Sequence, residues 1–148
     1  MEFITGLPKS KKQNDSIFIV INKLSKAAHF IFMKSTYKAM NIVDIFLKEI
    51  FILHGIPKEI ISNNVNFIEN FWKYLFLGLE MQLTFRTACH PQTDGKTKRV
   101  NQIVKDMLQM YVMKNPMKWE DYMHTTGFVY NNGYQDSCKM SPFEVLYG

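Results

Sequence analysis

The sequence predicts an α/β fold with one mixed sheet of five strands and flanking helices. Short apolar runs rich in β-branched residues come first along the chain, as in a meander of strands. Runs with helical spacing of apolar residues follow and alternate with further short strand-like runs. The length of 148 residues fits a single domain, residues 1–148, whose core is large enough to fold without disulfides or metal ions.

The first third of the chain predicts three strands. Residues 16–21 (SIFIVI) are almost continuously apolar, which is typical of a strand buried on both faces. Residues 29–33 (HFIFM) have the same character, and residues 22–26 make a tight connection, so the two runs predict a hairpin. Residues 2–4 predict a truncated first strand, followed by a polar loop over residues 6–14.

The middle of the chain predicts two helices and the last two strands. Residues 40–53 repeat apolar side chains at helical spacing, and Gly55 and Pro57 end that run. After a short strand over 59–62 and a loop over 63–66, residues 67–79 predict a second helix with Phe71 and Trp72 in the core. Residues 82–86 (QLTFR) predict the fifth strand.

Two further helices complete the prediction. The first follows the loop 89–95 and carries an apolar stripe from Val100 through Ile103, Val104 and Leu108 to Val112. The last helix covers about residues 119–132, and a polar turn leads to the segment 141–148.

Composition and charge exclude several classes of protein. A content of 47% hydrophobic and 21% charged residues is that of an ordinary globular protein, and no apolar run is long enough to cross a membrane. Cys89 and Cys138 are too few for a disulfide scaffold and lack the spacing of a zinc site, which favours a reducing intracellular compartment, nuclear or cytoplasmic.

The net charge of +5 is unevenly distributed. Residues 1–40 and residues 86–118 each carry +5, whereas the remaining segments together carry −5. If the two basic segments meet in the fold, they form a cationic face suited to a polyanion. The same numbers are also consistent with lysines scattered over a solvated surface.

Seven motifs then follow one another nearly from end to end of the chain. They are FITGLP (3–8), NKLSKAAHF (22–30), HGIP (54–57), FW (71–72), HPQTDGKTKRVNQ (90–102), YNN (130–132) and MSPFEVLYG (140–148). In this order and spacing they resemble the integrase catalytic core of gypsy-class LTR retrotransposons, a part of the Pol polyprotein. The resemblance implies an RNase H-like fold and DNA integration, in which element DNA ends are joined to target DNA by phosphoryl transfer.

The resemblance also implies where catalytic residues belong. In that family three carboxylates hold two divalent metal ions, Mg²⁺ or Mn²⁺, which activate the attacking oxygen and stabilise the leaving one. Carried over to this sequence, the three positions are Glu2, Asn63 and Lys98, so all three are altered. The 34 residues between Asn63 and Lys98 are one fewer than the family's spacing. We therefore expect a catalytically inactive relic with no metal cofactor.

Taken without the resemblance, the same residues have ordinary structural interpretations. Asn63 suits a turn, Lys98 a solvated helix surface and Glu2 the frayed end of a strand. Asp94 could replace a lost ligand, but it also suits the cap of the following helix. The four histidines lack the spacing of zinc ligands, which favours structural roles; they are His29, His54, His90 and His124.

The helix after residue 95 carries the residues expected to bind nucleic acid. They are Lys96, Lys98, Arg99, Asn101, Gln102 and Lys105. Lysine and arginine contacts to phosphates carry no sequence information, so we expect weak, non-specific binding to DNA. The alternatives are a non-catalytic nucleic-acid-binding module and a protein-interaction scaffold. A homodimer is compatible with either, and neither a membrane nor a small-molecule substrate is expected.

Overall fold

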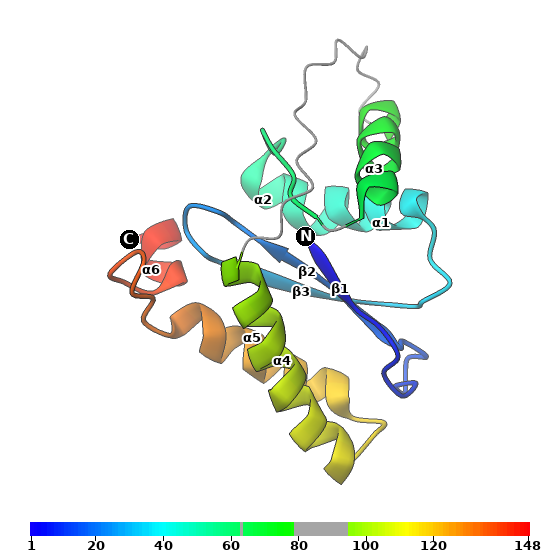
Figure 1. Cartoon of the computed structure of the whole chain (residues 1–148), viewed down its shortest axis with the longest axis vertical. Helices are drawn as coiled ribbons and strands as arrows, with labels where there is room; N and C mark the ends of the chain where they lie inside the picture. The colour runs from blue at the N-terminus through cyan, green and yellow to red at the C-terminus, as the bar shows by residue number, and fades with distance from the viewer. Residues whose placement is uncertain (63, 79–94) are drawn as a thin grey trace. The chain divides into compact units, whose positions relative to one another are not determined.

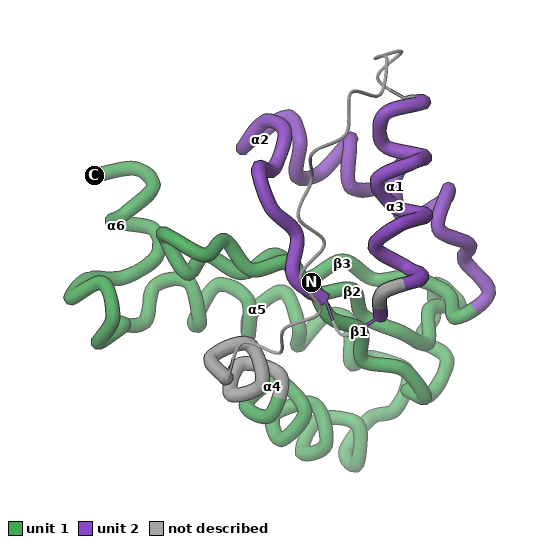
Figure 2. Tube along the Cα trace, turned by 45° about the horizontal axis from the view of Figure 1, so that its top comes forward, with its two compact units in different colours: residues 1–35, 95–148 green, residues 36–94 purple. Residues whose placement is uncertain are grey.

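The computed structural model describes residues 1–62, 64–78 and 95–148, without the side chains of residues 65, 78 and 95–101. The chain divides into two compact units, shown in green and purple in Figure 2. Unit 1 comprises residues 1–35 and 95–148, and unit 2 comprises residues 36–94. The expectation of one domain stays a prediction.

Unit 1 contains an antiparallel sheet of three strands in the order β1-β2-β3. The strands are β1 (Glu2–Ile4), β2 (Ser16–Ile21) and β3 (Ala28–Met33). In the register, Ile4 lies opposite Ile17 and Ile21 lies opposite Ala28. The predicted hairpin and the predicted short first strand are therefore confirmed.

The burial of the strands follows from their place in the sheet. The central strand β2 is buried on both faces, with Ile17 and Ile19 on one side and Phe18 and Val20 on the other. Strand β3 was expected to be equally buried, but its residues 29–32 are only half-buried. That expectation was wrong because, among the described residues, β3 pairs with β2 alone and lies at an edge of their sheet, which its own residues do not reveal.

Helices α4 (Gly95–Lys114) and α5 (Trp119–Asn132) pack on one face of this sheet. Helix α4 contacts β1, α5 contacts β3, and the two helices contact each other (Figure 1). The core between these layers consists of Ile4, Ile17, Ile19, Val104, Leu108, Trp119 and Met123. The predicted start of α4 and both ends of α5 are confirmed, but Ile103 lies outside the buried stripe and is 51% exposed.

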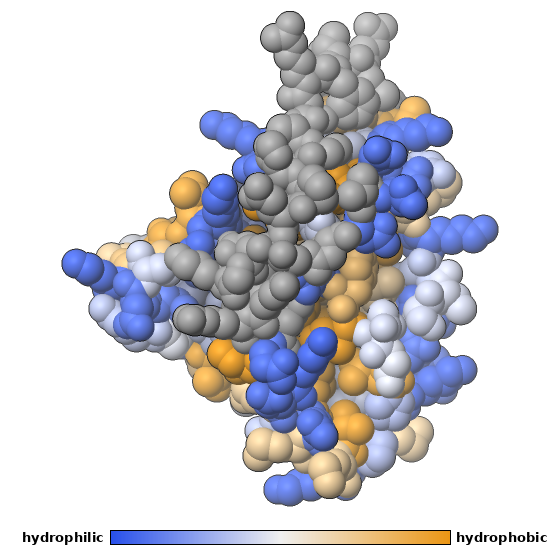
Figure 3. All heavy atoms as spheres, viewed as in Figure 1, coloured by the Kyte–Doolittle hydropathy of each residue, from blue (hydrophilic) through white to orange (hydrophobic). Residues whose placement is uncertain are grey.

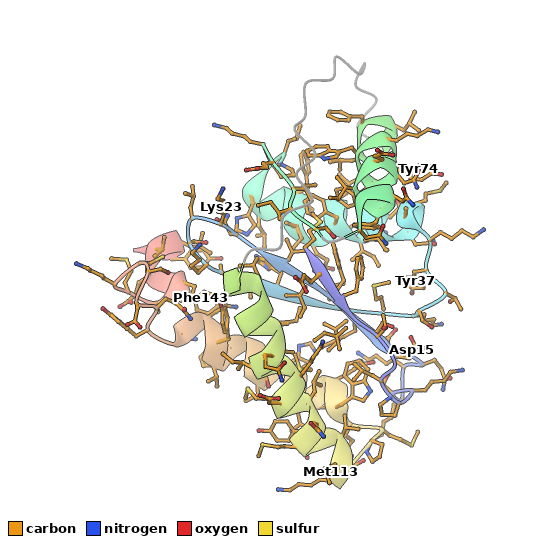
Figure 4. The ribbon with its side chains drawn as sticks, in the orientation of Figure 1. Asp15, Lys23, Tyr37, Tyr74, Met113 and Phe143 are labelled. Atoms are coloured by element: carbon orange, nitrogen blue, oxygen red, sulfur yellow. The ribbon has the colours of Figure 1, made fainter. Side chains whose placement is uncertain are left out.

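The last element of unit 1 is α6 (Pro142–Tyr147), whose first turn is closed by a capping box. The Ser141 hydroxyl accepts from the Glu144 N–H, and the Glu144 carboxylate accepts from the Ser141 N–H at 2.7 Å. These bonds to Ser141 hold the pKa of Glu144 below its ordinary value. Phe143, labelled in Figure 4, lies with its ring centroid 5.9 Å from that of Tyr147.

Unit 2 begins with a continuous helical stretch where one helix over 40–53 was predicted. It consists of α1 (Ala39–Phe46), a π-helical turn η1 (Leu47–Phe51) and α2 (Ile52–His54). Gly55 ends the stretch with a φ of +72°, a conformation that favours glycine.

Helix α3 (Val65–Gly78) packs against α1 to form the core of unit 2. The rings of Phe46 and Phe71 meet edge to face at 5.1 Å, and Trp72 is buried beside them in α3, as predicted. The predicted loop over 63–66 is too long, because α3 already begins at residue 65. The Asn64 side chain accepts from the Phe67 N–H at 3.0 Å and caps this earlier start.

The expectation of a mixed five-stranded sheet needs correction. In the part of the chain that the structure describes, the sheet has three strands, all antiparallel. Of the predicted strand over 59–62, the described residues show a single bridge residue, Ile61. The predicted strand over 82–86 lies outside the described residues.

Candidate functional site

Glu2, the first expected catalytic position, is the first residue of β1 and is half-buried. It lies opposite Ile19 in the register of β1 and β2. Ile4, two residues later on the same strand, belongs to the core that α4 also enters through Val104 and Leu108. The strand that carries Glu2 is therefore fixed against the helix that carries Lys98.

Lys98 lies in the first turns of α4, as the sequence predicts. Its side chain and those of Lys96, Arg99 and Asn101 are outside the described residues, as is Asn63. The convergence of Glu2, Asn63 and Lys98 on one site therefore stays a prediction.

Gln102 and Lys105 are the described members of the expected DNA-binding set, and both are exposed. Gln102 Nε2 donates to Asp106 Oδ1 at 2.8 Å, one helical turn further on. Asp106 therefore adds a negative charge next to Lys105 and engages the Gln102 amide NH₂ group, which is then less available to bind DNA. The i+4 spacing already indicated this pairing, but the sequence prediction did not use it. Figure 3 shows hydrophilic side chains of α4 beside apolar ones on this face of unit 1.

A buried polar cluster around Glu120 was not predicted from the sequence. Glu120, in the first turn of α5, is 5% exposed and accepts from the Ser10 hydroxyl and from Asn14 Nδ2, the latter at 2.9 Å. The Ser10 hydroxyl oxygen in turn accepts from the N–H groups of Lys12 and Asn14, each at 3.2 Å. These bonds fasten the loop between β1 and β2 to the start of α5, which is a structural role.

Among the described residues, no group of three or more His, Cys, Asp or Glu side chains is placed to hold a metal ion. None of the helices in the described ranges is both long enough and apolar enough to cross a bilayer.

The sequence is similar to those of known transposon polyproteins. The chain is 32% identical over 148 residues to the Tf2-3, Tf2-4 and Tf2-5 transposon polyproteins of Schizosaccharomyces pombe. These alignments cover 99% of this chain but only 11% of each polyprotein. No protein-family model matches the chain.

Solved structures with a similar fold are retroviral integrases. The trimeric form of the HTLV-2 integrase catalytic core domain in complex with magnesium matches 97% of this chain with a TM-score of 0.64 and 16% identity, and it is itself covered completely. A second similar structure is an intasome of simian T-cell lymphotropic virus in complex with the PP2A regulatory subunit B56 gamma. The match covers 99% of this chain and 52% of the matched chain of the intasome, with a TM-score of 0.72 and 17% identity.

The solved structures are only 16% and 17% identical to this chain, so their similarity establishes the fold alone. The similarity to the transposon polyproteins is a sequence similarity that extends along 99% of the chain. The chain is therefore homologous to a short segment of these transposon polyproteins and has the fold of a retroviral integrase catalytic core.

Proposed function

We propose that this chain is the integrase catalytic core of a gypsy-class LTR retrotransposon and that this copy no longer catalyses integration. The observation that carries the first half is the 32% identity to transposon polyproteins along 99% of the chain. The fold of retroviral integrase cores and the order of the seven motifs support the same assignment. The inherited reaction is the joining of element DNA ends to target DNA.

The second half rests on the chemistry of the three inherited catalytic positions. Glu2 keeps a carboxylate, Asn63 offers a neutral amide, and Lys98 offers an ammonium group, which cannot ligate a metal ion while it is protonated. The three side chains carry no net charge, where three carboxylates would carry −3. At about 4 Å and an effective dielectric constant near 20, an ammonium group and a divalent ion repel each other by several kcal/mol. This donor set does not fit two divalent metal ions.

The function that remains is DNA binding through α4. The residues proposed to contact DNA are Lys96, Lys98, Arg99, Asn101, Gln102 and Lys105. Gln102 and Lys105 are exposed, which supports their inclusion, although the bond from Gln102 to Asp106 reduces what the amide offers. Because lysine and arginine contact phosphates rather than base edges, the binding is weak and without sequence preference.

Self-association accompanies this proposal. The HTLV-2 integrase core domain, which shares the fold, is described in a dimeric and in a trimeric form. A protein-interaction scaffold remains the second candidate function. Exposed apolar side chains favour it, such as Phe128 on α5, which is 63% exposed, and Tyr147 on α6, which is 74% exposed.

A strand-transfer assay tests the proposal. The chain is incubated with a duplex that has a recessed 3′ end, a target plasmid and Mg²⁺ or Mn²⁺, next to an active retroviral integrase as positive control. We expect neither strand transfer nor 3′-end processing by the chain. Strand transfer that Glu2→Ala abolishes would contradict the proposal and show that another carboxylate, Asp94 first, has taken over.

A further inference from the structure

The loop between β1 and β2 carries three exposed lysines, Lys9, Lys11 and Lys12. Two hydrogen bonds hold this loop against the connection between α4 and α5. The Trp119 indole N–H donates to the Pro8 carbonyl at 2.7 Å, and the Lys11 N–H donates to the Met117 carbonyl at 3.3 Å. The main chain that carries the three lysines is therefore tied to the residues on either side of Lys118.

The buried carboxylate of Glu120 secures the same contact from the inside. It accepts from the Ser10 hydroxyl, and Ser10 lies between Lys9 and Lys11. Because Glu120 is 5% exposed, its hydrogen bonds are protected from water. Glu120 thus holds the lysine-bearing loop in place, while its own carboxylate is buried and does not face solvent.

The end of α4 and the connection to α5 contribute two more exposed lysines, Lys114 and Lys118. We call the five lysines together the basic junction; its members are Lys9, Lys11, Lys12, Lys114 and Lys118. They come from the two segments of the sequence that each carry +5, so these segments do meet within unit 1. Met113, labelled in Figure 4, marks this end of α4.

The acids on the same elements cancel only part of this charge; Asp15, for example, has a Coulombic interaction with Lys9. Glu120 is buried, and Asp15, at the start of β2, is hydrogen-bonded to Ser35. Asp121 is the exposed acid in the first turn of α5. On α4, Asp106 is also exposed, so four carboxylates stand against five lysines, and one of the four is turned away from solvent.

The basic junction is separate from the residues of α4 expected to bind DNA. Lys105, the nearest of those residues, precedes Lys114 by 9 residues on the same helix, which is about 13.5 Å at 1.5 Å per residue, and Lys98 precedes it by 16 residues, about 24 Å. One phosphate cannot contact both regions. The other end of α4 therefore offers an additional place for a polyanion.

We propose that the basic junction is a second contact surface of this protein for the phosphate backbone of double-stranded DNA. The proposal builds on the proposed DNA-binding role and adds a site that the inherited motifs do not contain. Because hydrogen bonds already hold the main chain of the loop between β1 and β2, its lysines lose less conformational entropy when they bind DNA. The exposed apolar side chains here, Met113 and Met117, are too few to insert into a membrane surface.

The test compares two variants that lose the same charge. The junction variant carries Lys9→Gln, Lys11→Gln, Lys12→Gln and Lys118→Gln. The control carries Lys48→Gln, Lys58→Gln, Lys73→Gln and Lys139→Gln, four exposed lysines that are not members of the basic junction. Fluorescence anisotropy with a random-sequence duplex at several salt concentrations gives the slope of log affinity against log salt for each protein.

We expect the junction variant to lose up to about 3.6 from that slope, about 0.9 for each phosphate contact, and the control to lose much less. Equal slopes for the two variants would overturn the proposal. So would binding to vesicles of 30% phosphatidylserine and 70% phosphatidylcholine that depends on these lysines while DNA binding does not. Melting temperatures of all variants check that they fold.

A third variant separates this proposal from the proposed function. It carries Lys98→Ala, Arg99→Ala and Lys105→Ala on α4. If it loses salt-dependent binding and the junction variant does not, the DNA-binding role stands and the junction is excluded. If the unmodified chain shows no salt-dependent binding to DNA, both proposals are wrong.

Discussion

Asn131 on α5 is hydrogen-bonded to both main-chain groups of Ala28 on β3. Its Oδ1 accepts from the Ala28 N–H at 2.9 Å, and its Nδ2 donates to the Ala28 carbonyl at 2.9 Å. A neighbouring strand would make the same pair of bonds, so at Ala28 the amide takes the place of a strand partner. The YNN motif, one of the seven motifs that carry the family resemblance, thus has a structural role at its central asparagine.

Replacing this asparagine should destabilise unit 1. Asn131→Ala leaves two buried main-chain groups without partners, so we expect a loss of about 2 kcal/mol in the free energy of unfolding. Asn132→Ala is the matched control, because Asn132 is exposed and bonds only within its own helix, to the Phe128 carbonyl. Urea denaturation measures both. Equal losses would show that the bonds to Ala28 do not stabilise the edge.

The buried carboxylate of Glu120 should be equally important. Glu120→Ala leaves the Ser10 hydroxyl and the Asn14 amide without their acceptor, and we expect a loss of about 2 kcal/mol. Asp121→Ala removes an exposed acid from the same helical turn and should change stability by less than about 0.5 kcal/mol. Thermal and urea unfolding followed by circular dichroism compare the two. A stable Glu120→Ala protein would show that the loop does not need this acceptor.

Stability in acid should depend on Asp15. The Ser35 N–H donates to Asp15 Oδ1 at 2.6 Å and the Ser35 hydroxyl to Oδ2 at 2.9 Å, and these bonds lower the pKa of Asp15. A carboxyl whose pKa is lower in the folded than in the unfolded protein stabilises the fold above its unfolded value, about 3.9, and this contribution is lost as the pH falls through the folded pKa. Asp15→Asn should therefore flatten the fall of stability below about pH 4.

An NMR titration of the Asp15 carboxyl carbon checks the cause directly. Ser35→Ala removes the hydroxyl bond and keeps the N–H bond, so the pKa of Asp15 should rise part of the way toward its ordinary value. An Asp15 that titrates at its ordinary value in the unmodified protein would refute the assignment.

The pattern of apolar residues and glycines along the sequence correctly predicted those elements whose bounds are set by their own residues. The bounds of β2 and α5 follow from continuous and periodic apolar spacing, and Gly55 marks a helix end because of its own backbone conformation. The half-burial of β3 and the exposure of Ile103 depend instead on which elements lie beside them, and no local pattern contains that information.

The candidate site divides in the same way. The identities of Glu2, Asn63 and Lys98 are readable because motifs fix their positions in the sequence. The basic junction was only a conditional expectation, because it depends on the bond between Lys11 and Met117, residues more than a hundred positions apart. The Glu120 cluster, which also joins distant segments, gave no signal that the sequence analysis used.

Single reversions at the inherited positions should not restore a metal site. Asn63→Asp adds one ligand but leaves the ammonium group of Lys98, and Lys98→Glu leaves a neutral amide at position 63. Neither protein should show a rise in Tm with Mn²⁺ beyond that of the unmodified chain. A Mn²⁺-dependent rise for Asn63→Asp alone would mean that Lys98 does not lie near the ligands.

The central claim is that the inherited catalytic positions no longer bind divalent metal ions, and a calorimetric Mn²⁺ titration tests it most directly. We compare the unmodified chain with the triple variant Glu2→Asp, Asn63→Asp and Lys98→Glu, which restores a charge of −3. We predict that the unmodified chain does not bind Mn²⁺ and that the triple variant does. We expect metal binding to be restored without strand transfer, because ligands misplaced by about 1 Å can lower the reaction rate 10²-fold. Saturable binding of Mn²⁺ by the unmodified chain that Glu2→Ala abolishes would contradict the account.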